Sequence, residues 1–234
     1  MKNIIISLNL KGFKIYLINF YSIILVVDIF FYFIFTQLIY NAPLKHLSID
    51  YYTLIQYQIK YLLNFDISVF TDTVKIFLRN FNVVLGCFWA TYHIKNNIIN
   101  NKQHNNIVNL YKLLSYLVPI ALGIVIGHTT AKFYEKIGNN FFSVFLTSII
   151  TMFAHGIIEL TTIALISYIL FFKVYKELYN QNLNEKIIIN KINESYNNLY
   201  NHLIFIAFLF ATAAFIEAKS SCGSLYYLFL LNSQ

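Results

Sequence analysis

A histidine and a glutamate, His155 and Glu159, stand four residues apart inside an apolar run that extends from Phe141 to Phe172. If this run is helical, positions i and i+4 lie on one face, so the imidazole and the carboxylate can contact each other or a common third group. A charge at the centre of a membrane span costs on the order of 2.5–3.5 kcal/mol on insertion scales, which makes such a pair a candidate functional site. The chemistry open to the pair is ion pairing, proton relay or the binding of an ion.

Further polar side chains interrupt the other apolar segments. They are Asp28, Lys75, Arg79, Asn80 and Glu217, and Lys75 is close enough to the end of its segment to reach the membrane surface. Because lone charges are poorly tolerated in a bilayer while paired ones are tolerated, we expect these groups to pair with one another. Arg79 can bind a carboxylate with its planar fork, so we expect it to lie against Glu217 or Glu159.

The sequence patterns of several known intramembrane enzymes are missing from this chain. It contains no His-Glu-x-x-His motif for a zinc protease and no Gly-x-Ser-x setting for a nucleophilic serine. The clusters of cysteine, histidine and carboxylate that make a metal site specific are also missing, and Cys87 and Cys222 have no metal or redox spacing. We therefore assign no catalytic residues, no metal and no cofactor, and an intramembrane hydrolase is the least favoured function.

The composition indicates an integral membrane protein. Of the 234 residues 58% are hydrophobic and 12% are charged, and the mean hydropathy is +0.60. A soluble domain averages about 25% charged residues. The longest polar stretch, roughly 173–201, has the length of a loop, so we predict a single membrane domain over 1–234. The net charge of +7 is spread over several loops rather than gathered in one patch, which argues against a nucleic-acid partner.

The elements that must position the polar residues are membrane-spanning helices, each of about 20 mainly apolar residues. Five segments qualify, at about 15–40, 69–94, 113–130, 141–172 and 202–218. The predicted fold is an all-α, multi-pass transmembrane helical bundle. The 141–172 run would be about 48 Å long as one straight helix, against a hydrocarbon core of about 30 Å. We therefore predict a break near Ala154-Gly156, with a short half-helix before it and a full span after it.

Two segments between the spans have helical apolar spacing. In 47–68 one face carries Ile55, Ile59 and Leu62, and the residues turned away from it are Gln56, Gln58 and Lys60. This pattern predicts an interfacial helix on the outer leaflet. The polar 173–201 stretch contains an apolar stripe of Ile188, Ile192, Tyr196 and Leu199. The stripe predicts a helix that leads into the last span.

The third predicted span contains two glycines four residues apart, Gly123 and Gly127, followed by His128. Small residues at this spacing let two helix backbones approach closely in a membrane. We therefore expect this face of 113–130 to pack tightly against another helix rather than to bind a ligand.

The lysines predict the orientation of the spans. Five spans with a cytoplasmic N-terminus place ten lysines on the cytoplasmic side: Lys2, Lys11, Lys14, Lys95, Lys102, Lys112, Lys173, Lys176, Lys186 and Lys191. Five lie on the outer side: Lys45, Lys60, Lys132, Lys136 and Lys219. Because short lysine-rich loops normally face the cytoplasm, we predict a multi-pass protein of the cell membrane with a cytoplasmic N-terminus and an external C-terminus.

Two motifs resemble the stage II sporulation protein M family of integral membrane proteins. They are His155-Gly156-Ile157-Ile158-Glu159-Leu160 and, nearer the end, Ala213-Ala214-Phe215-Ile216-Glu217-Ala218. The family typically shows Pro-His-Gly-x-x-Glu-Leu/Ile and a later Ile-Glu-Ala segment, and its upstream Phe-x-x-Asn is similar to Phe77-Leu78-Arg79-Asn80. The resemblance covers about 70–218. The chain departs from the pattern at Ala154, where the family usually has proline, and at Gly127-His128, where Asn-Gly is commoner.

The resemblance implies a membrane scaffold that, in spore-forming bacteria, associates with peptidoglycan-degrading partners during engulfment. Relatives also occur in archaea and in bacteria that form no spores. We therefore predict a scaffold or assembly subunit whose partners are the lipid bilayer and a membrane or envelope protein, with a homo-oligomer as an open alternative. The alternative function is a transport or permease-like subunit in which His155 and Glu159 relay protons or bind an ion at the midplane. A water-filled path to Glu159 would favour transport, and a dry bundle would favour the scaffold.

Overall fold

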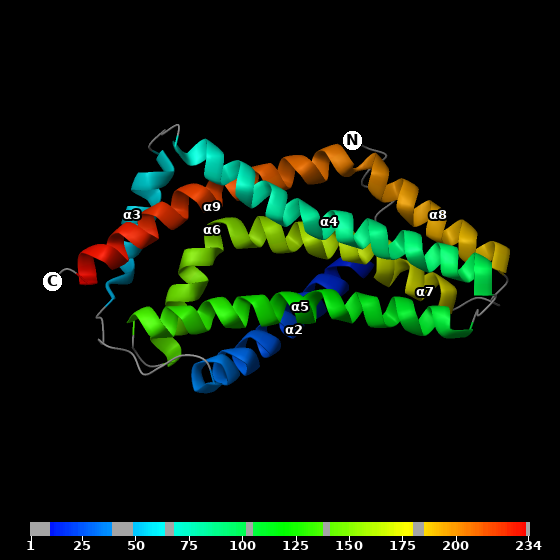
Figure 1. Cartoon of the computed structure of the whole chain (residues 1–234), viewed down its shortest axis with the longest axis horizontal. Coiled ribbons are helices and arrows are strands. Elements are labelled where there is room, and N and C mark those ends of the chain that lie inside the picture. Colours follow the sequence, from blue (N-terminus) through cyan, green and yellow to red (C-terminus); the bar gives the residue numbers. More distant parts are fainter. Residues whose placement is uncertain are drawn as a thin grey trace.

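The computed structural model describes residues 10–38, 49–63, 68–101, 105–137, 141–179 and 185–232, and the regular structure in these ranges is helical (Figure 1). In chain order the elements are α2 (Leu10–Leu38), α3 (Tyr51–Leu63), α4 (Ser68–Asn101), α5 (Asn105–Ile137), α6 (Phe141–Ser167), the π-helical segment η1 (Tyr168–Phe172), α7 (Lys173–Tyr179), α8 (Glu185–Asn201) and α9 (Leu203–Asn232). The predicted all-α, multi-pass helical bundle is confirmed.

Within the described ranges, four helices are long and apolar enough to cross a bilayer. They cover Lys11–Gln37, Ile107–Tyr134, His155–Tyr179 and Leu203–Ser220. These correspond to four of the five predicted spans. The remaining prediction, 69–94, lies in α4, which has 34 residues and a length of about 51 Å at 1.5 Å per residue. α4 falls outside the four because Lys75, Arg79, Asn80 and Asn82 lower its hydropathy, yet it packs along α9 and α6 within the bundle (Figure 1).

The break predicted near Ala154-Gly156 is wrong, because the helix bends without being interrupted there. α6 is helical without interruption from Phe141 to Ser167. Figure 1 shows that its first turns run steeply to the rest of the helix. The steep first turns and the span that follows them therefore belong to one continuous helix. The departure from α-helical bonding comes later, in η1.

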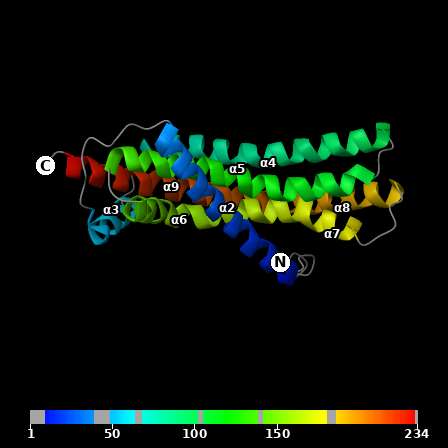
Figure 2. The same cartoon turned by 90° about the horizontal axis from the view of Figure 1, so that it is seen from below.

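α2 and α5 approach each other closely at the two glycines of α5. A Cβ placed on Gly123 would lie 2.6 Å from Val27 Cβ, and one on Gly127 would lie 2.7 Å from the carbonyl oxygen of Asp28. α2 runs obliquely across the other long helices (Figure 2). Only a residue without a Cβ lets the two backbones come this close, so the predicted tight packing at this glycine pair is confirmed.

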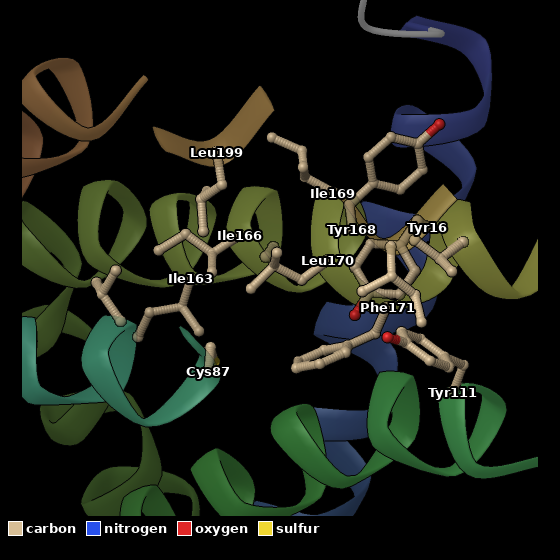
Figure 3. Close-up of a cluster of buried hydrophobic side chains, with 14 of the residues drawn as sticks. Tyr16, Cys87, Tyr111, Ile163, Ile166, Tyr168, Ile169, Leu170, Phe171 and Leu199 are labelled. Atoms are coloured by element: carbon tan, nitrogen blue, oxygen red, sulfur yellow. The ribbon is translucent and has the colours of Figure 1, made fainter. Parts of the chain in front are cut away.

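η1 lies in the centre of the hydrophobic core. Its residues Tyr168, Ile169, Leu170 and Phe171 are all buried. A helical segment that is apolar on every side is one surrounded by protein. Figure 3 shows this segment between Tyr16 of α2, Tyr111 of α5 and Leu199 of α8. The hydroxyl of Tyr16 donates to the carbonyl oxygen of Ser115 at 3.1 Å and lies 2.7 Å from Ser167 Oγ, so α2, α5 and α6 are joined at this level.

The polar stretch 173–201, which was predicted to have the character of a loop, is folded over most of its length. α7 and α8 pack beside the C-terminal end of α4 and the N-terminal end of α5, at one end of the molecule (Figure 1). The hydrophobic core continues into this region through Ile94, Ile107, Leu178, Ile188, Ile192 and Leu199. The predicted helix before the last span is confirmed as α8. Of its predicted stripe, Tyr196 is the more exposed member and packs edge-on against Phe88, with 4.8 Å between ring centroids.

α8 leads almost directly into α9, because His202 alone stands between them. The amide of His202 donates to Leu199 O at 3.0 Å, and the amide of Ile206 donates to His202 O at 2.9 Å. Backbone hydrogen bonding therefore continues through the junction, although the two helices meet at an angle (Figure 1).

α3 packs on α9 through the side that carries Leu54 and Gln58, and Ile55 and Ile59 are exposed. Gln58 Nε2 donates to Ser224 Oγ at 2.9 Å. In a membrane setting an apolar side chain is stable toward lipid, while an amide needs a hydrogen-bonding partner inside the protein. The exposed Ile55 and Ile59 are compatible with the predicted interfacial helix, whereas the burial of Gln58, which was expected to turn away with Gln56 and Lys60, was not predicted.

Candidate functional site

Arg79 and Glu217 form an ion pair between α4 and α9, as the sequence predicts. Arg79 Nη2 lies 2.9 Å from Glu217 Oε1 and 3.2 Å from Oε2, so one terminal nitrogen binds both carboxylate oxygens. The Arg79 side chain is 64% exposed and the Glu217 side chain 16% exposed. Arg79 Nε also donates to Asn80 Oδ1 at 3.1 Å. The pair therefore lies at the edge of the bundle, with the carboxylate on the inner side.

His155 and Glu159 of α6 lie on the inner side of this ion pair. His155 is 6% exposed, and Glu159 is half-buried. Both interact electrostatically with Glu217 and Arg79. The four residues therefore lie in one cluster, as predicted, and this cluster connects α4, α6 and α9. Two carboxylates face one guanidinium here, so the group is neutral when one carboxyl is protonated or when the imidazole is charged.

Two polar atoms of this cluster lack a hydrogen bond of ordinary length and angle to the described residues. They are His155 Nδ1 and Asn80 Nδ2, both shielded from solvent. The Asn80 side chain interacts with the Glu159 carboxylate. Of the two polar atoms of the Asn80 amide, only Oδ1 makes a hydrogen bond of ordinary length and angle, which it accepts from Arg79 Nε. Buried polar groups are normally satisfied, so these two atoms are the part of the cluster able to accept a further polar partner. Within the described ranges, no group of three or more histidines, cysteines and carboxylates could hold a metal ion.

Gly156 is buried beside His155, and it makes no close approach to another helix. A Cβ placed there would meet Met152 Cβ at 3.8 Å, an ordinary van der Waals contact.

Asp28 belongs to a different site, contrary to the expectation that the intramembrane charges pair with one another. It is buried on α2, and its Oδ1 accepts a hydrogen bond from Thr130 Oγ1 of α5 at 3.1 Å. Thr130 Oγ1 also lies 3.1 Å from Ser148 Oγ of α6. Asp28 therefore joins three helices through hydroxyl groups and not through a base. Hydroxyl groups are common in spans, so their spacing alone did not mark Thr130 and Ser148 as partners.

Lys75 lies away from the cluster, near the start of α4, where its exposed ammonium is 3.7 Å from Asp72 Oδ1. This position agrees with the expectation that Lys75 reaches the membrane surface.

Lys219 and Gln58 are buried polar residues that were not predicted as part of a site. Lys219 is 3% exposed, its Nζ donates to Leu62 O at 3.1 Å, and it lies 4.9 Å from the centroid of the Phe215 ring. The signal was present in α9, where Glu217, Ser220 and Ser224 recur at helical spacing at and beyond the end of the last predicted span. These residues belong to the same helix as that span, which continues to Asn232.

Comparison with family models, with curated proteins and with solved structures finds no match to this chain. The resemblance to the stage II sporulation protein M family therefore stays a prediction that rests on the motifs. Four helices able to span a bilayer indicate a multi-pass membrane protein.

Proposed function

We propose that this protein is a membrane scaffold or assembly subunit in which buried polar contacts fix the register of the helices and the outer helix faces receive partners. The observation that carries the proposal is the Arg79–Glu217 ion pair, which ties α4 to the apolar helix α9. α4 is the long helix that lacks the hydropathy of the four spans. The ion pair therefore specifies where α4 packs against α9.

Other intramembrane polar contacts also connect helices. Asp28 and Thr130 connect α2 to α5, Gln58 and Ser224 connect α3 to α9, and Tyr16 lies against Ser167 between α2 and α6. Interhelical hydrogen bonds of this kind hold membrane bundles together where the hydrophobic effect between helices is weak. Their distribution through the bundle supports a structural use of the polar residues.

The residues that carry the family resemblance support the same proposal. Arg79 and Asn80, His155 and Glu159, and Glu217 come from three separate segments, yet they meet in one cluster. By the resemblance, the partner is a membrane or envelope protein.

The distribution of lysines supports a cytoplasmic N-terminus. Lys95 at the end of α4, Lys112 near the start of α5, and the lysines of α7 and α8 all belong to the end of the bundle that α7 and α8 form. By the positive-inside rule this end faces the cytoplasm. Five crossings, with α4 as the second, then place the C-terminus outside the cell membrane.

A transport function is the second candidate, and one observation favours it. His155 Nδ1 has no hydrogen-bond partner among the described residues and belongs to the same cluster as the Glu159 carboxylate, and an imidazole with a carboxylate is the chemistry of a proton relay. Glu159→Gln separates the two candidates, because glutamine keeps the hydrogen-bonding shape and loses the titrating proton.

The test combines partner identification with transport assays. Cross-linking and mass spectrometry in native membranes should find a stable membrane or envelope protein, and Glu159→Gln should retain it while Arg79→Ala loses it. The transport candidate predicts instead a flux into reconstituted vesicles that depends on a pH gradient. If Glu159→Gln folds normally and abolishes such a flux, the scaffold proposal is wrong.

A further inference from the structure

α4 presents two opposite faces, each with a regular spacing of alternately three and four residues. The inner face consists of Asn80, Val84, Cys87, Thr91 and Ile94, all buried against the protein's own bundle. We define the outer seam of α4 as Leu78, Asn82, Leu85, Trp89 and Tyr92. All five residues of the seam are exposed, with exposed fractions of 55% for Leu78, 53% for Leu85, 66% for Trp89 and 57% for Tyr92.

The spacing of the outer seam is that of a helix–helix interface. Residues 78, 82, 85, 89 and 92 occupy the a and d positions of a heptad, with Asn82 and Trp89 at a and the others at d. Leu78, Leu85, Trp89 and Tyr92 would also be stable toward lipid. Asn82 is the residue of the outer seam that distinguishes a helix-binding face from a lipid-facing one.

Asn82 makes an uncovered outer seam costly. On the inner face, Asn80 interacts with Glu159, and Cys87 lies beside Ile163 (Figure 3). Both partners belong to the His155–Tyr179 span, so Asn82, between Asn80 and Cys87, is at the level of that span. Asn82 is exposed, and its side chain makes no hydrogen bond to any residue that the structure describes. Lipid chains offer an amide no partner, and an unsatisfied amide in an apolar medium costs several kcal/mol (about 2–7 depending on the reference state).

We propose that the outer seam of α4 binds the outer seam of a second copy of this chain, in a parallel two-fold pair with the two Asn82 amides hydrogen-bonded across the axis. A carboxamide has both donors and an acceptor, so Asn82 is complementary to itself. Copies inserted in the same direction are related by a two-fold axis along the membrane normal, which brings identical residues of parallel helices together. A single asparagine at an a position is the device that fixes register in such pairs.

Two neighbouring features fit a second copy of α4. Gly86, four residues after Asn82, is exposed and has open space where a Cβ would be, so it allows close approach of another helix. Lys75 continues the same heptad toward the start of the helix. Its exposed ammonium pairs with Asp72 of the same chain, so in a pair of helices the lysines of both copies can stay in water. The outer seam is separate from the polar cluster of α4, α6 and α9, so this inference does not depend on the proposed scaffold function.

Cysteine cross-linking in membranes tests the proposed pair. In a background with Cys87→Ser and Cys222→Ser, Asn82→Cys and Leu85→Cys should form a covalent dimer under mild oxidation at low protein-to-lipid ratio. The matched controls are Val125→Cys on α5 and Phe208→Cys on α9, whose native residues are also exposed, at 63% and 66%. These controls should stay monomeric. Equal cross-linking at seam and control positions, no cross-linking at the seam, or cross-linking of the seam only to a different protein would overturn the proposal.

The amide contact is tested with variants that leave the seam apolar or keep the amide. Asn82→Val should weaken dimerisation in lipid nanodiscs by about 3- to 30-fold, which corresponds to an interhelical hydrogen bond of roughly 0.6–2 kcal/mol. Asn82→Gln should retain part of the affinity. Because Asn82 is exposed, both variants should keep the helical content and thermal stability of the single chain. An unchanged dissociation constant for Asn82→Val in a folded protein would show that the amides do not meet.

Discussion

Arg79 and Glu217 are 138 residues apart in the chain, and their side chains lie 2.9 Å apart. The carboxylate is largely shielded while the guanidinium is mostly exposed, so the two ends of the ion pair have different surroundings. Loss of either partner therefore has a different consequence. Without Arg79, the shielded carboxylate has no counter-charge, whereas without Glu217 the guanidinium can still turn outward.

Arg79→Ala should accordingly destabilise the bundle more than Glu217→Ala does, with a loss of about 1–3 kcal/mol for the unpaired carboxylate. The double variant with Arg79→Leu and Glu217→Leu should recover much of this loss, because it leaves neither charge unpaired. Thermal unfolding of the purified protein in one detergent measures all three. Lys75→Ala is the matched control and should stay within about 0.5 kcal/mol of the native protein, as expected for an exposed site. Equal effects of Arg79→Ala and Lys75→Ala would contradict this account.

The glycines of α5 should be far less replaceable than the glycine of α6. Alanine at Gly127 would put a Cβ 2.7 Å from a backbone oxygen of α2 and 3.0 Å from Phe31 Cβ. Overpacking of this kind typically costs about 1–3 kcal/mol, and it outweighs the gain of roughly 1 kcal/mol that alanine brings to a helix.

Gly156→Ala is the control, because the nearest atom to its added Cβ is at 3.8 Å. It should be neutral or stabilising by up to about 1 kcal/mol. Thermal unfolding in the same detergent compares the two variants. Similar melting temperatures for Gly127→Ala and Gly156→Ala would show that α2 and α5 do not approach at Gly127.

The stability of the α7–α8 region should depend on alkaline pH through Lys191. This ammonium lies 3.0 Å from Glu194 Oε2 and 3.2 Å from Glu177 Oε2, and hydrogen bonds to these carboxylates raise the pKa of Lys191. A pKa raised by folding adds stability that is fully present below the ordinary lysine pKa of about 10.5 and is lost as the pH rises through the higher folded value. The stabilisation by Lys191 should therefore be complete at neutral pH and be lost progressively above about pH 10.

Lys191→Met should remove this alkaline dependence. Melting temperatures of the native protein and the variant, measured from pH 8 to pH 11, should differ most at pH 8 and converge at the alkaline end. Tyrosine ionisation is common to both proteins and cancels in the difference. A difference that stays constant across the range would contradict the expected contribution of the ammonium.

The orientation of the bundle can be read from two single cysteines in a background without native cysteines. Lys60 on α3 and Lys112 on α5 are both exposed, and the predicted topology places them on opposite sides of the membrane. A membrane-impermeant thiol reagent added to intact cells should label Lys60→Cys at once and Lys112→Cys only after lysis. Labelling of both from outside would contradict the predicted topology.

Part of this structure follows from the sequence because the physical rule involved is strong. Apolar runs of sufficient length must span a bilayer, and a lone arginine among apolar residues must find an acid. Four spans could therefore be predicted, and the partner of Arg79 could be narrowed to Glu217 or Glu159. The close approach of α2 followed equally well from two glycines four residues apart. Each of these features depends on residues that have few alternatives.

Other features depended on information that periodicity does not contain. The packing of α3 on α9 could not be predicted, because the burial of Gln58 depends on Ser224, which lies opposite it and is 166 residues away in the chain. Asp28 binds a hydroxyl, which carries no charge signal in the sequence. α7 and α8 had the polarity of a loop, because their stabilising contacts come from the ends of α4 and α5, beyond the apolar runs.

The single residue between α8 and α9 makes these two helices one mechanical element from Glu185 to Asn232. α8 lies largely at the polar end of the bundle, and Glu217 lies four turns along α9 from His202, at about 3.6 residues per turn. A protein that binds α8 from the aqueous side therefore binds the same hydrogen-bonded helical unit that carries the Glu217 carboxylate. Any tilt of α8 must either be taken up as bending at His202 or be transmitted as a displacement of Glu217 against Arg79.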